Sequence, residues 1–278
     1  MIRVAAVGDV HAGVDSAGSL RPRWDRLADE ADCLLLAGDL TKGGEVDEAA
    51  VLAGELDGLG LPVVAVLGNH DHHAGTPDAV SDVLTDAGIT VLEGEASLVE
   101  VDGGTLGVVG AKGFGGGFEG AMATEFGEEE MKAFVRHTRE RAEAIDRSLR
   151  DLEAEVRIVL LHYAPVRDTL IGEPPEIFPF LGSYLLAEPC DRAGIDLIVH
   201  GHAHRGQHEG TTNGGVPVRN VAMPVIERAY VVFSFDLDRT GRAAGSPSPS
   251  VSLALSRSPA KKAPSISAPV VATDRFTH

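Results

Sequence analysis

The stretch Val63-Val64-Ala65-Val66-Leu67-Gly68-Asn69-His70-Asp71 indicates both the fold class of this chain and the place of its candidate functional residues. Its five apolar residues predict a buried β-strand. Gly68 allows the backbone to turn sharply where that strand ends. An amide, an imidazole and a carboxylate then follow in a row, which is more typical of a functional loop than of an ordinary surface turn.

Two further strands precede this stretch, and each of them also ends in polar residues: Asp9 and His11 follow the first strand, and Asp39 follows the second. The expected elements, in order, are strand 2–7, helix 20–31 with Pro22 in its first turn, strand 33–37, helix 45–58 and strand 63–67. Strands that alternate with helices across short loops predict a parallel sheet. Ligands bind at the carboxyl ends of such strands, so we expect these polar residues to lie together.

The remainder of the chain predicts a second, antiparallel or mixed sheet. Residues 102–104, Asp-Gly-Gly, are a hairpin signal. A glycine-rich loop, 113–120, carries Phe114 and Phe118. The expected elements are helix 77–87, strands 90–92, 98–101 and 106–109, helix 128–153, strand 157–161, helix 183–193 and strands 196–199, 218–222 and 230–236.

Composition limits the classes of function that need consideration. The chain has 278 residues, of which 44% are hydrophobic and 24% charged, as in a globular domain. Its net charge of -18 argues against a long nucleic acid held on a basic face. We expect a catalytic domain over 1–242 and a Ser/Pro/Ala-rich, disordered tail over 243–278, in which Val251–Leu255 could add a strand.

Neither a leader peptide nor a long apolar run is recognisable, and the two cysteines, Cys33 and Cys190, form no CxxC pattern. We therefore expect a cytoplasmic, unanchored protein with reduced thiols. Its oligomeric state is left open.

The strand ends together offer one amide, two carboxylates and five imidazoles: Asp9, His11, Asp39, Asn69, His70, His162, His202 and His204. Residues i and i+2 of an extended backbone point to the same side, so the pairs Asp9/His11 and His202/His204 can each flank one point. This mixture of donors suits Mn, Fe or Zn better than Ca or Mg. There are more donors than one metal ion needs, and a carboxylate can bridge two ions that hold a hydroxide between them.

In these residues the chain resembles the calcineurin-like metallophosphoesterase superfamily, whose pattern is DxH, GD, GNH[D/E], H and GHxH. The sequence contains all five motifs in that order, as Asp9-Val10-His11, Gly38-Asp39, Gly68-Asn69-His70-Asp71, His162 and Gly201-His202-Ala203-His204, and the resemblance covers about residues 1–236. It implies an α/β fold of the four-layer α/β/β/α sandwich type with two mixed sheets. It also implies metal-dependent hydrolysis of a small phosphomonoester or phosphodiester.

The resemblance further implies a role for each residue. Asp9, His11 and His204 would bind one metal ion, Asn69, His162 and His202 a second, and Asp39 would bridge the two. His70 would assist the leaving group, and Asp71 beside it could orient the imidazole ring.

Candidate substrate contacts are Phe114, Phe118, Tyr163 and Thr169. The two phenylalanines could instead pack under the long helix. Two other functions remain as alternatives to a small-ester phosphoesterase. One is a nuclease of the same superfamily, although no added DNA-contacting domain is recognisable. The other is a non-catalytic protein-binding scaffold, which would be expected to have lost ligands or His70.

Overall fold

A computed structural model describes residues 1–237 of the chain. The expected tail over 243–278, its boundary at 242 and the possible strand Val251–Leu255 therefore lie outside the described residues. Within residues 1–237, no helix is both long and apolar enough to cross a membrane. Both cysteines, Cys33 and Cys190, are buried free thiols.

The first sheet has the strand order β13-β1-β2-β3-β4. Its strands are β1 (Ile2–Val7), β2 (Cys33–Ala37), β3 (Val63–Val66), β4 (Thr90–Val91) and β13 (Val231–Phe235). Strands β1 to β4 are parallel, and β13 pairs antiparallel with β1. The predicted parallel sheet is thus confirmed, and the carboxyl ends of β1, β2 and β3 lie along one edge.

The second sheet is mixed, with the strand order β11-β12-β10-β9-β6-β5. Its strands are β5 (Ala96–Val101), β6 (Gly104–Ala111), β9 (Val156–Leu161), β10 (Leu197–His200), β11 (Glu209–Thr211) and β12 (Pro217–Asn220). The hairpin expected at 102–104 joins β5 to β6. Strands β6, β9, β10 and β12 are parallel, so the ends of β9 and β10 also reach one edge of their sheet.

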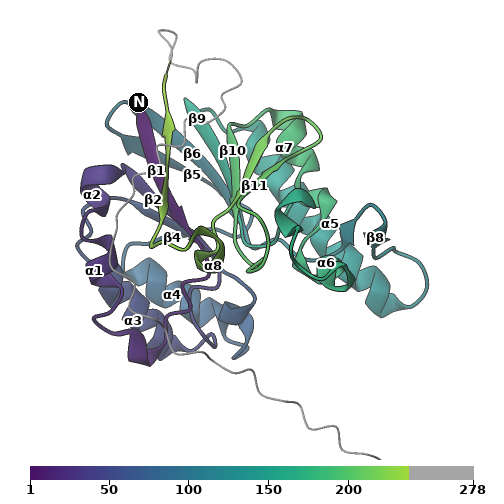
Figure 1. Ribbon diagram of the computed structural model, residues 1–278, viewed down its shortest axis with the longest axis horizontal. Coiled ribbons are helices and arrows are strands. Elements are labelled where there is room, and N and C mark those ends of the chain that lie inside the picture. Colours follow the sequence, from purple (N-terminus) through teal and green to yellow (C-terminus); the bar gives the residue numbers. More distant parts are fainter. Residues whose placement is uncertain (238–278) are drawn as a thin grey trace, which may run out of the picture.

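The two sheets pack face to face, and helices cover their outer faces (Figure 1). Strand β9 shows why. Ile158 and Leu160 belong to the core between the sheets, whereas Val159 and Leu161 pack on the other side, in a cluster that includes Ile145 of the long helix. A strand with both faces buried reads as a continuous apolar run. The structure thus confirms the α/β fold with two mixed sheets in a four-layer sandwich.

The helices are α1 (Arg21–Trp24), α2 (Leu27–Glu30), α3 (Val46–Leu56), α4 (Pro77–Asp86), α5 (Glu129–Arg150), α6 (Phe178–Leu181), α7 (Glu188–Ala193) and α8 (Met223–Ile226). Two expectations need correction. Helix 20–31 is interrupted at Asp25 and Arg26, a turn that lets both Trp24 and Leu27 reach the core. Helix 183–193 is a short 3-10 turn (Tyr184–Leu186) followed by α7, because Pro189 has no N–H for a continuing helix and stands instead in the first turn of α7.

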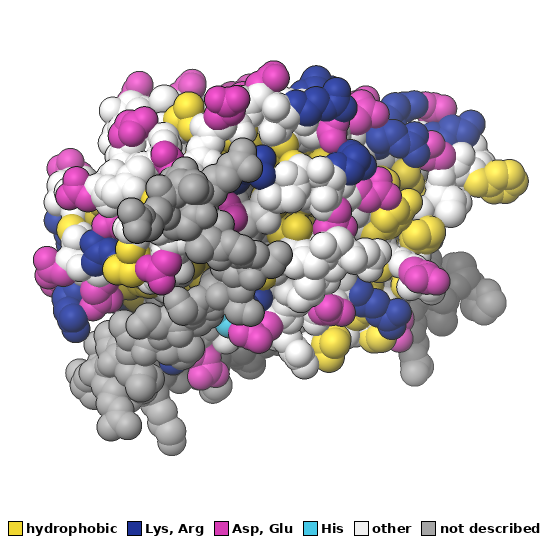
Figure 2. All heavy atoms as spheres, turned by 90° about the horizontal axis from the view of Figure 1, so that it is seen from above, with side chains coloured by type: hydrophobic (Ala, Val, Ile, Leu, Met, Phe, Trp, Pro, Cys, Tyr) yellow, Lys and Arg dark blue, Asp and Glu magenta, His cyan; other side chains and the backbone are white. Residues whose placement is uncertain are grey.

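The glycine-rich segment 113–120 also differs from the expected open loop. It contains β7 (Gly117–Phe118), which pairs with β8 (Ala121–Met122). The space-filling view in Figure 2 shows acidic side chains scattered over the visible surface of the described residues, with the largest group of Lys and Arg side chains at the upper right and others at the left end. This distribution reflects the strong acidic excess of the chain.

Candidate active site

The ends of β1, β2, β9 and β10 bring the charged and imidazole residues of the sequence motifs into two adjoining groups. Asp9, His11, Asp39 and His204 form one group, and Asp39, His162 and His202 form the other. Within each group the possible ligand atoms lie within 4.8 Å of one another. Asp39 belongs to both groups. One carboxylate therefore stands between two sites that could each hold a metal ion.

Four of these residues have a left-handed backbone conformation that non-glycine residues rarely adopt. The φ angles are 59° for Asp9, 47° for His11, 48° for Asp39 and 69° for His202. Each such residue costs of order 1–3 kcal/mol and persists where the surroundings hold it in place. At Asp9 that support is visible, because its carboxylate accepts the N–H of His202 at 3.1 and 3.0 Å.

The glycines of the motifs allow backbone to approach the ligand side chains closely. A Cβ atom on Gly68 would lie 2.1 Å from Asp39 Oδ1, and one on Gly201 would lie 2.4 Å from Asp9 Oδ2. Any side chain at either position would therefore displace a carboxylate of the site. This explains physically why glycine precedes Asn69 and His202.

Burial keeps most of the imidazoles neutral, which is the form that binds metal ions. It lowers the pKa of His11, lowers that of His162 well below its ordinary value, and lowers that of His202 to about 3. Burial also raises the pKa of Asp9 to about 6, although His204 Nε2 lies 2.8 Å from its Oδ1. That hydrogen bond in turn raises the pKa of His204. A buried carboxylate of this kind is unfavourable unless a positive charge compensates it.

His162 supplies the clearest test of whether the residues fit a metal ion. Its Nδ1 lies 2.9 Å from the carbonyl oxygen of Ala37, which can only accept, so Nδ1 carries the proton. In the neutral ring Nε2 then presents a lone pair, yet Asp39 Oδ1 lies 3.2 Å and Asn69 Oδ1 2.9 Å away. Three electron-rich atoms converge here, an arrangement that a bound cation would stabilise.

His70 lies at the open side of this centre. Its backbone N–H donates to Asp39 Oδ1 at 2.8 Å, and its side chain is 45% exposed. Ring Nδ1 lies 2.7 Å from the carbonyl oxygen of Lys42, and ring Nε2 lies 4.0 Å from Asp39 Oδ2. Because the carbonyl requires a proton on Nδ1, Nε2 is left to face the site.

Asp71 does not orient that ring, and this expectation is corrected. Its fully buried carboxylate accepts hydrogen bonds from the backbone N–H groups of Leu40, Thr41 and Gly68 and from the Thr41 hydroxyl. The carbonyl of Lys42 holds the ring instead. Asp71 is therefore a positioning residue that acts through the loop after β2.

The four expected substrate contacts separate into two pairs. Thr169 is fully buried and its hydroxyl bonds to His200 and to the Val166 carbonyl, so the expected substrate contact is corrected. Phe118 is 4% exposed and belongs to a small apolar cluster, so the expected substrate contact of this residue is corrected as well. The members of that cluster are Phe118, Ala164, Leu170, Phe178, Leu181 and Ala203.

Tyr163 and Phe114 lie nearer to the possible metal ligands. The Tyr163 ring contacts the His202 ring at a tilt of 43°, with 4.4 Å between centroids, and the Phe114 ring lies 5.7 Å from the Tyr163 ring. Phe114 is half-buried and also contacts Phe134 and His137 of α5. Phe114 thus packs against the long helix α5, which was the alternative to a substrate contact.

Sequence reasoning did not identify the backbone carbonyls that hydrogen-bond to the imidazole rings of the site. The carbonyls of Ala37 and Lys42 have no sequence signal, since every residue carries one. Lys112 did have a signal: it is a charged residue directly after β6, at the end of a strand that is parallel to β9.

Comparison with known proteins shows the family of this chain and solved structures that share its fold. Residues 2–206 match the family model described as calcineurin-like phosphoesterase. Among solved structures, the phosphopantetheinyl hydrolase of Mycobacterium tuberculosis is 17% identical, with a TM-score of 0.58 over 81% of this chain and 90% of that one. A protein of Thermus thermophilus, TT1561, is also 17% identical, with a TM-score of 0.52 over 79% of this chain and 88% of that one. At this identity the similarity establishes the shared fold. No curated protein sequence matches the chain significantly.

Proposed function

The chain belongs to the calcineurin-like phosphoesterase family, and from this membership we propose that it hydrolyses a small phosphomonoester or phosphodiester with the help of two metal ions. The observation that carries the proposal is the position of Asp39, whose carboxylate is common to both groups of possible ligands. A carboxylate has two oxygen atoms, so one side chain can serve two cations.

The proposed ligand sets follow these two groups. Asp9, His11 and His204 would hold the first ion, and Asn69, His162 and His202 the second, with Asp39 between them. Neutral imidazoles, carboxylates and one amide oxygen suit Mn, Fe or Zn. When bound, such ions supply the Lewis acidity that activates water and neutralises the oxygens of a phosphoryl group.

The chain's own residues supply the remaining part of the mechanism. His70 Nε2 faces the site while Nδ1–H is held by the Lys42 carbonyl. In the doubly protonated ring, the proton on Nε2 can pass to the oxygen of the leaving group, which leaves the neutral ring with its proton on Nδ1. Asp71 keeps that carbonyl in place through its bonds to Thr41. Proton donation matters most when the leaving group is a poor one.

A nuclease activity remains the second candidate within the same chemistry, and the net charge of -18 disfavours it. A scaffold without catalysis is disfavoured because every motif residue, including His70, is present. A cytoplasmic location remains a prediction.

Metal analysis combined with two chromogenic substrates tests the proposal. The purified protein is expected to contain two metal ions per chain and to hydrolyse nitrophenyl phosphate or bis-nitrophenyl phosphate, with activity lost on chelation and restored by Mn, Fe or Zn. The ratio of the two rates will show whether monoesters or diesters are preferred. A metal-loaded protein that cleaves neither ester, and no other phosphate ester, would contradict the proposed function.

A further inference from the structure

Lys112 is a buried lysine beside the predicted metal ligands. It follows β6 directly and is only 8% exposed. Its carbonyl accepts the N–H of His162 at 3.1 Å and that of Tyr163 at 3.0 Å. The backbone of Lys112 is thereby fixed to the loop that carries a metal ligand.

The ammonium group of Lys112 forms no direct ion pair with a described carboxylate. Among residues 1–237, no carboxylate lies within 4.0 Å of its Nζ. Its neighbours are two aromatic rings: Lys112 Nζ lies 5.3 Å from the centroid of the Phe114 ring and 5.7 Å from that of the Tyr163 ring. An ion removed from water costs several kcal/mol, of which cation–π contacts offset about 2 kcal/mol. The structure therefore holds a buried ammonium group with no direct ion pair among the described residues, although the carboxylates of Glu93 and Asp39 are close enough to attract it.

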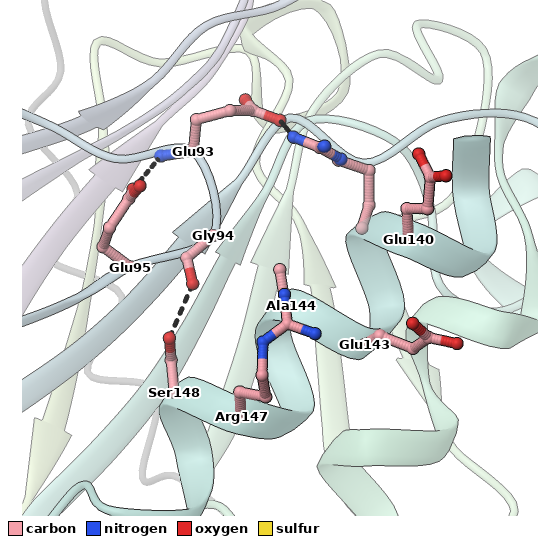
Figure 3. Close-up of a pocket in the computed structure, with 9 residues that line it drawn as sticks. Glu93, Gly94, Glu95, Glu140, Glu143, Ala144, Arg147 and Ser148 are labelled. Atoms are coloured by element: carbon pink, nitrogen blue, oxygen red, sulfur yellow. Dashed lines mark hydrogen bonds and ion pairs between the residues drawn. The ribbon is translucent and has the colours of Figure 1, made fainter.

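Glu93 is an acidic residue near Lys112, and its oxygens are engaged by other groups. One oxygen forms an ion pair with Arg141 of α5 at 3.2 Å, drawn as a dashed line from Glu93 in Figure 3. The other accepts the backbone N–H of Lys112 at 3.1 Å, so it bonds to the main chain and not to the ammonium.

Further groups of positive or potentially positive charge surround Lys112. Desolvation, and after it the charge of Lys112, lowers the pKa of both His72 and His137. The His137 ring also contacts Phe114, with 4.8 Å between centroids. Arg141 has a buried Nε with no hydrogen-bond partner among the described residues. Lys112 and Arg141 are thus two cationic groups close to Glu93, in a chain with a net charge of -18.

The position of the cluster relative to the metal ligands identifies what it could bind. Tyr163 contacts both Lys112 and His202: its ring centroid lies 5.7 Å from Lys112 Nζ and 4.4 Å from the centroid of the His202 ring. We propose that Lys112, together with Arg141 and His137, binds a second phosphate group of the substrate while the first lies at the metal centre. This inference rests on the proposed function. It assigns the substrate to small organic bisphosphates, with Phe114 against the part that links the two phosphates.

Matched substrates and matched variants test this proposal. The substrates are propane-1,3-diyl bisphosphate, its homologues with two to six carbons, and propyl phosphate, which has no second phosphate. The variants are Lys112→Met, which keeps the stem and removes the charge, and Lys132→Met, which makes the same change on the outside of α5. A propyl phosphate with a terminal carboxylate shows whether any anion suffices. Melting temperatures confirm that each variant is folded.

The wild-type protein is expected to prefer one bisphosphate over propyl phosphate. Lys112→Met should lower kcat/KM for that bisphosphate by roughly 10- to 100-fold, the usual worth of a hydrogen bond to a charged group, and leave propyl phosphate nearly unchanged. Lys132→Met should alter neither. Equal losses on both esters, or no loss on either, would overturn the second-phosphate site.

Failure of the proposed function can be told apart from failure of this site. If the metal-loaded wild-type protein cleaves none of these esters, the same bisphosphates are titrated calorimetrically as ligands. The site then predicts tighter binding of a bisphosphate than of propyl phosphate, weakened about 10- to 100-fold by Lys112→Met. Binding that is equal for the two ligands would overturn it.

Discussion

The carboxylate of Asp71 accepts two hydrogen bonds from Thr41, one from the backbone N–H at 2.8 Å and one from the hydroxyl at 2.6 Å. Its other oxygen accepts the N–H of Leu40 at 3.1 Å and that of Gly68 at 2.7 Å. One buried side chain thus fastens the loop after β2 to the loop after β3. Lys42 follows Thr41 directly, so the same bonds also fix the carbonyl that holds the His70 ring.

We therefore predict that Asp71→Asn weakens both folding and catalysis. The new amide nitrogen would face backbone N–H groups and leave buried donors unpaired, which costs about 1–3 kcal/mol of unfolding free energy. Urea unfolding and turnover of a chromogenic ester measure the two effects. Asp82→Asn, on the exposed face of α4, is the matched control and should change neither. Lost turnover at unchanged stability would instead give Asp71 a direct part in the chemistry.

Asp39→Asn is expected to abolish activity and to lower the content of both metal ions. The reason is that the carboxylate of Asp39 belongs to both groups of possible metal ligands, so the loss of its charge should weaken the binding of both ions. Asp9→Asn is the control, because Asp9 belongs to one group only and its loss should deplete one ion first. Elemental analysis of the purified variants measures the effect. Two fully occupied ions and near-normal turnover in Asp39→Asn would contradict the bridging role.

Sequence patterns predicted the parts of this structure that depend on local physics. The bounds of β1 and β2 agree to the residue, because buried parallel strands are short apolar runs between turns. The strand ends likewise located Asp9, Asp39 and His162, since parallel strands share one edge. The break at Asp25 and Arg26 was not predictable in this way, because it depends on how Trp24 and Leu27 both reach the core.

Contacts between distant segments explain the remaining differences. The partner of Asp71 is Thr41, 30 residues away in sequence, whereas proximity in sequence suggested His70. Phe118 finds its apolar neighbours in 164–203, although its own loop offers none. Lys112 stood at a strand end, yet only the structure shows that no carboxylate of the described chain pairs with it. Tertiary packing decided each of these cases.

Phe118→Ala should destabilise the fold without changing substrate preference. The ring is 4% exposed and packs with Leu170, Phe178 and Leu181, and truncation of a buried phenylalanine costs about 3–5 kcal/mol. Denaturant unfolding measures the loss, and KM is compared for several esters. Phe126→Ala is the control, since that ring is 86% exposed. A selective rise in KM for a larger ester, at unchanged stability, would restore Phe118 as a substrate contact.

Glu55 predicts a pH dependence of stability away from the active site. Burial opposes ionisation of its carboxylate, but the N–H groups of Gly18, Leu20 and Arg21 donate to it and hold the pKa of Glu55 below its usual value. A folded-state pKa below the unfolded one means that the contribution is complete above the unfolded pKa, about 4.3. It is lost as the pH falls through the folded-state pKa.

Glu55→Gln should therefore lower the unfolding free energy by about 1–3 kcal/mol at pH 7. The difference between wild type and variant should shrink as the pH falls below about 4. Urea unfolding of both proteins between about pH 3 and pH 7 measures this difference in unfolding free energy. Glu143→Gln, on the exposed surface of α5, controls for general charge effects. A difference that stays constant across this range would show that the charge of Glu55 does not contribute.

His70→Ala separates leaving-group assistance from metal binding. His70 lies outside both groups of possible ligands, so the variant should retain both metal ions. Its Nε2 faces the site while Nδ1 is held by Lys42, which is the geometry of a proton donor. An alkoxide needs that proton and a nitrophenolate does not. The rate should consequently fall by about 10²–10⁴-fold for alkyl phosphates and by much less for nitrophenyl phosphate.

The comparison between the two esters decides the role of His70. Both rates are measured on the same protein sample, so a change in metal content or folding would affect both esters alike. His73→Ala removes an exposed imidazole from the same loop and should leave both rates unchanged. Equal losses for the two esters would instead indicate that His70 holds the phosphate and donates no proton.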